Sequence, residues 1–440
     1  MLIIISKILW AVATSFILIS GLYFTFKLRF IQFDFKNMFK SLFSKENKNE
    51  EISPIQTFLL SLGGRIGVGS IAGIALSIYI GGIGTVFWMW VTSLLLISNS
   101  FVETVLGNIY KRKMQNGAYN GGPSYYLSYG LGKKKLGVLY SVIILISYIG
   151  GFLGIQANTI TKSFNEVYNI NPVIIGIIIC LITFFIIFGG LKKIIDASTK
   201  LVPIMAIIYL GMSFLIIITQ IDKFPSVMSL IITEAFNFKS FLFGFLPTFI
   251  IGLQRGIFSN EAGLGTGSIA SSATTDHNSI RQGYIQMAGI YISILICTVT
   301  VFVILLSDYE VVNLTSINGI ELVQRAFLAS FGKTGIYTIL ISIILFSFST
   351  IIAGYYYGEN ALTFLMKKTS KKALLILKLV TILIVFIGSV MSSKLLWDLV
   401  DMMVAVLSIL NIYALLSLRK EISYEIDCQK YRKCDKIKNR

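Results

Sequence analysis

The chain has 440 residues, of which 55% are hydrophobic and only 13% are charged, and its formal net charge is +17. Soluble domains carry about 25% charged residues, so this composition excludes an ordinary soluble protein and favours a chain embedded in a bilayer. The net charge does not indicate nucleic-acid binding, because the Lys and Arg residues gather in alternate loops between apolar segments.

Eleven apolar segments are predicted to span the membrane as helices. In chain order they cover residues 4–26, 54–80, 83–110, 137–161, 172–190, 199–218, 240–270, 279–306, 335–365, 373–391 and 395–417. The connections that follow the odd-numbered segments hold most of the Lys and Arg residues. Because such an excess marks the cytoplasmic side, we expect an external N-terminus and a cytoplasmic C-terminus in a prokaryotic plasma membrane.

The segments divide into two sets of five after an extra first helix. We expect residues 1–53 to form this helix and a basic loop, 54–218 and 219–417 to form two five-helix repeats, and 418–440 to form a basic tail. An odd number of spans per repeat inverts the second repeat relative to the first, as alternating access requires. Residues 307–334 are polar and then amphipathic, so they predict either an external helix or a solvated loop.

A glycine-rich hexapeptide occurs twice, as Gly67–Ala72 and as Gly265–Ala270. Glycine costs about 1 kcal/mol in a helix interior, so each copy predicts a break in an apolar helix. Paired breaks are typical of the substrate site of a secondary transporter, although small residues at close helix contacts produce the same composition. Opposed breaks offer free N–H groups and free carbonyls, which suit the two ends of an amino acid.

The first break is therefore predicted to bind the substrate carboxylate, and the end of the second broken helix to supply carbonyls. The expected substrate-binding residues are Gly67, Val68, Gly69, Ser70, Phe258, Ser259 and Asn260. Gln156 either bonds the substrate or bridges helices, as does Asn158. A sodium ion prefers hard oxygen ligands, so we expect one at the backbone of Ile66 and Gly67 and the hydroxyls of Ser349 and Thr350.

Ionisable residues inside apolar segments are costly and therefore point to function. Arg65, Arg255, Glu261 and Asp401 are predicted to act as gating or structural charges. Glu103 lies near a predicted cytoplasmic end, where snorkelling of its side chain would explain it. No catalytic residues are expected, because neither a nucleophile–base pair nor a metal cluster is visible.

Several motifs make the chain resemble the alanine or glycine:cation symporter family. The longest is Gln254–Gly265, and the others are Gly64–Gly73, Phe87–Trp90, Gly121–Tyr126, Gln156–Asn158, Gly189–Lys193, Leu201–Pro203, Phe346–Ile352 and Tyr356–Glu359. The resemblance implies an all-α, leucine-transporter-like fold with broken helices and an added N-terminal helix. It also implies uptake of a small neutral amino acid such as alanine or glycine, with sodium as coupling ion and no cofactor.

The chain departs from the family pattern at two places near the expected site. The usual G-T-G-N reads Gly67-Val68-Gly69-Ser70, and Gly354 stands where the family tends to have tryptophan. Gly354 is therefore expected to leave room in the substrate pocket, which keeps glutamine or another larger neutral amino acid open, as well as proton coupling. A channel or a non-transporting nutrient sensor is the competing class. The expected partners are the amino acid, sodium and the lipid bilayer, with the protein a monomer.

Overall fold

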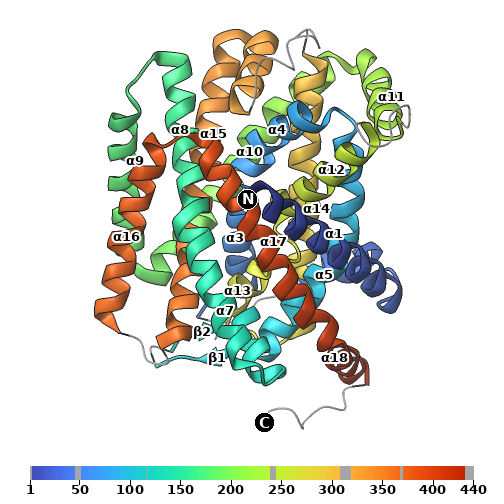
Figure 1. Cartoon of the computed structure of the whole chain (residues 1–440), viewed down its shortest axis with the longest axis vertical. Helices are drawn as coiled ribbons and strands as arrows, with labels where there is room; N and C mark the ends of the chain where they lie inside the picture. Colours follow the sequence, from blue (N-terminus) through green and yellow to red (C-terminus); the bar gives the residue numbers. More distant parts are fainter. Residues whose placement is uncertain are drawn as a thin grey trace.

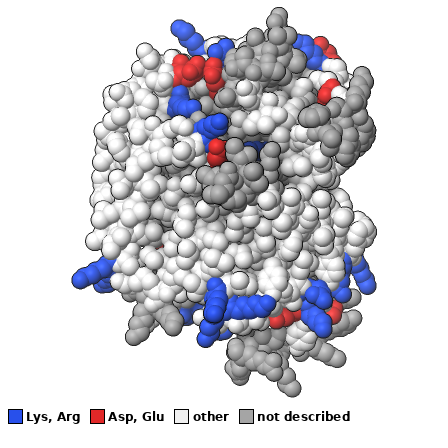
Figure 2. All heavy atoms as spheres, in the orientation of Figure 1, with Lys and Arg blue, Asp and Glu red and all other residues white. Residues whose placement is uncertain are grey.

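The computed structural model describes residues 2–44, 51–115, 117–237, 244–307, 319–366 and 370–431. Within these ranges the chain is helical apart from loops and a two-stranded antiparallel hairpin of β1 (Arg112–Lys113) and β2 (Tyr119–Asn120). Eight of the described helices are long and apolar enough to cross a membrane. Figure 2 shows charged side chains gathered toward the two ends of the molecule, with a belt of uncharged atoms between them. The chain is therefore an all-α polytopic membrane protein.

Helices occupy the described part of every predicted apolar segment. The chain begins with α1 (Leu2–Lys27), η1 (Ile31–Phe33), α2 (Phe35–Leu42), α3 (Pro54–Arg65), η2 (Val68–Ser70), α4 (Ala72–Gly81) and α5 (Thr85–Ile109). After the hairpin follow α6 (Pro123–Tyr125), η3 (Tyr126–Gly130), α7 (Lys134–Ile144), η4 (Leu145–Phe152), α8 (Leu153–Tyr168), α9 (Pro172–Ile187) and α10 (Gly190–Thr219).

The second half has the same helical character. It contains η5 (Ile221–Lys223), α11 (Phe224–Ala235), α12 (Leu246–Asn260), α13 (Thr266–Ser272), α14 (Ser279–Leu306), α15 (Ile320–Met366), α16 (Lys371–Val390), α17 (Ser393–Ser417) and α18 (Arg419–Tyr431). Non-helical backbone angles at Phe331 and Gly332 divide α15 into two parts. The first part buries Val323 and Phe327, so the helical alternative is confirmed from residue 320 onward, whereas its external position stays a prediction. Residues 308–318 of that prediction lie outside the described ranges.

Both predicted helix breaks are present. In the first, α3 ends at Arg65 and Gly67 is extended, with φ −102° and ψ −161°. In the second, α12 ends at Asn260, and Glu261, Gly263 and Gly265 have left-handed φ values of 53°, 82° and 92°. This second break precedes most of its hexapeptide, since α13 begins at Thr266. The two copies therefore match more closely in sequence than in conformation.

The two broken helices lie side by side and run in opposite directions. Helix α3 contacts α13, and α4 contacts α12. In Figure 1, α4 lies above α3 whereas α13 lies below α12. The additional helix α1 packs against α5 and α17, outside this pair. The two breaks consequently meet at one depth in the middle of the molecule.

Candidate functional site

The two breaks touch each other directly. The Ser70 hydroxyl Oγ donates to the Ser259 carbonyl over 3.4 Å, and the Ser293 hydroxyl donates to the same carbonyl over 2.7 Å. The Phe258 ring packs on Gly69, where an added Cβ would lie 2.8 Å from a ring carbon. Only glycine fits at position 69 without moving this ring. The structure thus brings these predicted residues of the two halves into one small volume.

Gln156 lies against the unwound backbone of the first break. The Val68 N–H donates to Gln156 Oε1 over 3.1 Å. A Cβ at Gly67 would lie 3.1 Å from that oxygen and 2.5 Å from Thr350 Oγ1, so Gln156, the break and α15 meet at this point. A carboxylate could accept from this N–H group in the same way as Gln156 Oε1 does here.

Two asparagines near the site have different environments. Asn260 Oδ1 accepts from the Ala262 N–H over 2.8 Å, whereas its buried Nδ2 has no partner among the described residues. That donor remains for a bound group. Asn158 Nδ2 instead donates to the carbonyls of Gly388 and Met391, at 3.0 and 2.8 Å. Asn158 therefore bridges α8 to the end of α16.

The predicted sodium ligands form a cluster of hard oxygen atoms. The hydroxyls of Ser349 and Thr350 donate to the Gly63 carbonyl over 3.2 and 2.9 Å, and Thr350 also reaches the Gly64 carbonyl at 3.5 Å. All four residues are buried. The contacts fall on carbonyls of the last turn of α3, N-terminal to the predicted Ile66 and Gly67. Hydroxyl and carbonyl oxygens are the donor types that hard cations prefer, so this cluster fits sodium.

Arg255 and Asp401 form the ion pair nearest to the second break. Their two contacts measure 3.1 and 3.4 Å. The guanidinium also lies over the rings of Phe258 and Trp397, at 5.5 and 5.4 Å from their centroids. Both charged residues border a cavity of about 480 Å³ between α4, α8, α15 and α17. The pair and the two rings therefore separate the break from this cavity, which we call the upper vestibule.

Arg65 and Glu261 are buried without forming a pair with each other. Arg65 donates to the Gln286 carbonyl over 2.8 Å and to the Ser100 hydroxyl over 3.3 Å. Glu261 accepts from the hydroxyls of Tyr148 and Thr266, at 2.7 and 2.8 Å. Each charge thus has hydrogen-bond partners around a break, although Arg65 Nε has none among the described residues.

Glu103 is buried and hydrogen-bonded to the second break, which the sequence did not predict. The expected snorkelling is wrong, because the side chain is 0% exposed. Its Oε2 accepts from the N–H groups of Gly263 and Gly265 at 3.2 and 3.1 Å, and from Asn411 Nδ2 at 2.9 Å. Glu103 therefore holds the second break open from α5. The sequence feature that indicates this role is the presence of two polar residues, Glu103 and Asn411, inside apolar segments.

Gly354 differs from its expected environment. A Cβ at this position would lie 2.6 Å from Leu153 Cδ1 and 3.2 Å from Tyr148 Cδ1, so the expected free space is taken by these two side chains. Tyr148 stacks on Phe152, and Phe152 stacks on Phe258, with centroid distances of 4.4 and 5.3 Å. Gly354 is therefore connected to Phe258 at the second break only through the rings of Tyr148 and Phe152.

The chain is similar to known transport proteins along nearly its whole length. A family model described as the sodium:alanine symporter family matches residues 1–440. The chain is 36% identical over 424 residues to the probable sodium/glutamine symporter GlnT of Bacillus subtilis, covering 95% of this chain and 87% of that one. It is 35% identical over 434 residues to the amino-acid carrier protein AlsT of the same organism, covering 97% and 91%. It is 31% identical over 413 residues to the sodium/alanine symporter AgcS of Methanococcus maripaludis, covering 91% and 90%.

Proposed function

Because the chain belongs to the sodium:alanine symporter family, and is therefore a transporter, not an enzyme, we propose that it imports a small neutral amino acid together with sodium. The observation that carries this proposal is the meeting of both helix breaks beside Gln156 and the hydroxyls of α15. The Val68 N–H, which donates to Gln156 here, and the unpartnered Asn260 Nδ2 suit a carboxylate. Carbonyls at the end of α12 suit an ammonium group.

The close packing around the two breaks supports a small substrate. Phe258 packs directly on Gly69, and Leu153 fills the space beside Gly354, which supports alanine or glycine. Glutamine is the alternative, supported by the relative named as a probable sodium/glutamine symporter. In both cases the binding residues are Gly67, Val68, Gly69, Ser70, Gln156, Phe258, Ser259 and Asn260, with Gly354 in a supporting position.

Sodium binding is proposed at Ser349, Thr350 and the backbone between Gly63 and Gly67. An ion among these oxygens connects α15 to the first break, so it stabilises the arrangement in which that break accepts a substrate. Coupling then follows, because each ligand favours the same conformation. Inward movement of one sodium charge gains about 2.3 kcal/mol per 100 mV of membrane potential.

The conformation supports alternating access between the upper vestibule and the lower end. At the lower end, the hydroxyl of Thr274 donates to the Ile52 carbonyl over 3.0 Å, and Lys111 Nζ donates to the Thr274 carbonyl over 2.8 Å. These contacts join the residues before α3 and after α5 to the segment after α13, which supports a closed lower end. The opposite directions of the broken helices support two inverted repeats, 54–218 and 219–417, in a leucine-transporter-like fold.

The proposed orientation places the basic lower end in the cytoplasm of a prokaryotic cell. The N-terminus before α1 is then external and the tail after α17 is cytoplasmic, and eleven spans cross the plasma membrane when the two broken helices count as one each. The two breaks meet within one chain, which supports a monomer as the transporting unit.

Uptake into proteoliposomes tests the proposal. Labelled alanine, glycine and glutamine are supplied under an imposed sodium gradient, and then under a proton gradient of equal size. We expect accumulation above the external concentration with sodium alone, with alanine or glycine preferred. Accumulation driven only by protons would contradict the coupling ion, and failure to accumulate any of the three would contradict the substrate class.

A further inference from the structure

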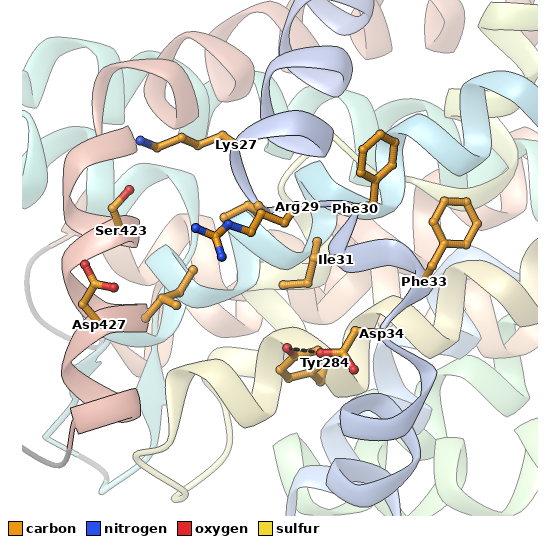
Figure 3. Close-up of a pocket in the computed structure, with 11 residues that line it drawn as sticks. Lys27, Arg29, Phe30, Ile31, Phe33, Asp34, Tyr284, Ser423 and Asp427 are labelled. Carbon is orange, nitrogen blue, oxygen red and sulfur yellow. Dashed lines mark hydrogen bonds between the residues drawn. The ribbon is translucent and has the colours of Figure 1, made fainter.

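We propose that the cavity at the lower end of α1 binds the headgroup of an ethanolamine phospholipid, with its phosphate at Lys27 and Arg29 and its ammonium at Asp427. The cavity has a volume of about 730 Å³ and lies between α1, η1, α14 and α18. Figure 3 shows Lys27 and Arg29 extending toward the side of α18 that carries Ser423 and Asp427. This site is separate from the transport path and does not depend on which solute is moved.

The cavity lies where headgroups are expected. The apolar part of α1 is Ile8–Lys27, so Lys27 marks the point at which this helix leaves the hydrocarbon. Ile19 and Phe26, on the preceding turns, are 60% and 64% exposed, as residues facing acyl chains are. A lipid beside α1 therefore has its phosphate at the level of Lys27.

The charges of the cavity match a zwitterion. The side chains of Lys27, Arg29 and Asp427 are exposed and have no hydrogen bond or ion pair with any described residue. Asp34, the other carboxylate, is already engaged by the Tyr284 hydroxyl at 2.8 Å and by Asn37 Nδ2 at 2.7 Å. Two free cations can bind one phosphate, and the free carboxylate then requires a cation with N–H donors. Ethanolamine supplies these donors, whereas choline has none and glycerol carries no positive charge.

The backbone at Arg29 is strained in a way that presents the guanidinium. Arg29 and Phe30 have φ values of 53° and 58°, in the left-handed region that favours glycine. The Phe30 N–H donates to the Thr25 carbonyl over 2.7 Å, which closes the end of α1 in a motif that usually has glycine at the position of Arg29. Figure 3 shows Arg29 directed into the cavity and Phe30 on the other side of the turn. Left-handed backbone at a residue other than glycine costs free energy and is found more often at functional positions.

The adjoining helix α2 is built to lie in the membrane interface. Its polar side carries Lys36 and Lys40, while Phe35 and Phe39 are 41% and 52% exposed. An amphipathic helix with exposed aromatic and basic residues rests on the headgroup layer. Helix α2 therefore positions the cavity beside the headgroup layer from which the lipid enters.

Native mass spectrometry of the purified full chain tests this site. The protein is titrated in detergent with phosphatidylethanolamine, phosphatidylcholine and phosphatidylglycerol of the same acyl composition. We expect phosphatidylethanolamine to be retained about tenfold more tightly than phosphatidylcholine, the effect of one charge-assisted contact. Arg29→Gly should reduce this retention about tenfold while preserving the fold, because glycine suits the backbone at this position.

Three further variants complete the test. Asp427→Asn should remove the preference for ethanolamine over choline, and Lys27→Gln should weaken retention in the same direction as Arg29→Gly. Lys135→Gln, an exposed cation on α7 outside the cavity, is the matched control and should change nothing. Equal retention of the ethanolamine and choline lipids by the unaltered protein would overturn the proposal. A preference for phosphatidylglycerol, or full retention in both the Arg29→Gly and Lys27→Gln variants, would overturn it as well.

Discussion

Ser349 and Thr350 are the residues on which sodium dependence should rest. Both hydroxyls donate to the Gly63 carbonyl oxygen in the last turn of α3. Replacing both with alanine removes two hard ligands, so we expect the sodium concentration for half-maximal uptake to rise about tenfold, equivalent to ~1.4 kcal/mol. Ser347→Ala is the control, since this buried hydroxyl on the same helix has no partner among the described residues. An unchanged sodium activation curve in the double variant would contradict the assignment.

Gln156 should affect the amino acid more than the ion. Its Oε1 is the acceptor for the Val68 N–H, and Gln156→Glu would place a negative charge where the substrate carboxylate is proposed to bind. We expect the KM for the amino acid to rise at least about tenfold, with sodium activation little changed. The control is Gln282→Ala, because Gln282 bonds Asp276 near the lower end. Equal KM values in the unaltered and Gln156→Glu proteins would place the substrate elsewhere.

Leu153 and Gly354 should behave as a coupled pair. Gly354→Trp alone drives a large ring into Leu153 and Tyr148, and overpacking of this kind costs about 1–3 kcal/mol. We expect a lower Tm and reduced uptake in this variant, and recovery of both when Leu153→Ala is added. Leu153→Ala alone should also lower the Tm, by creating a cavity. Additive losses in the double variant, measured by thermal unfolding in detergent, would show that the two side chains do not share one space.

At the scale of elements, α5 acts as the support of the second break. Glu103 accepts two backbone N–H groups from the segment between α12 and α13. Glu103→Gln retains the shape but weakens charge-assisted hydrogen bonds to buried groups, a loss of about 1–3 kcal/mol. We expect a reduced Tm and slower uptake, because α13 is less firmly placed. Asp222→Asn, at an exposed carboxylate in η5, is the matched control. A Glu103→Gln protein with unaltered Tm and uptake would exclude this supporting role.

The elements themselves were largely predictable, and their contacts were not. Apolar runs located the helices, and paired glycines located the breaks at Gly67 and before Gly267, because both signals are local. Asn411 and Glu103 are 308 residues apart in the chain, and no periodicity connects them. The same lack of local information explains why free space was wrongly expected beside Gly354. A glycine leaves space only if neighbouring side chains do not fill it. Leu153, which fills it here, lies on a different helix and is distant in the sequence.

For the whole molecule, the two ends of the transport path should open in turn. The lower end is closed by contacts between the Ile52 carbonyl and the segment after α13, whereas the upper vestibule stops at Arg255 and Asp401. Among the described residues, this pair and the rings of Phe258 and Trp397 lie between the vestibule and the second break. Closing them over a bound substrate must precede opening of the lower end, because a path open at both ends would dissipate the sodium gradient.

Asp401→Asn tests this gating role, since it removes the charge on one side of the pair and keeps the shape. We expect the maximal uptake rate to fall about tenfold, equivalent to ~1.4 kcal/mol in the barrier to closure, with the KM nearly unchanged because Asp401 lies outside the proposed binding volume. Asp398→Asn is the matched control, because Asp398 lines the same vestibule from the same helix. A raised KM with an unchanged maximal rate would make Asp401 a binding residue, and equal rates in both variants would remove the pair from the gate.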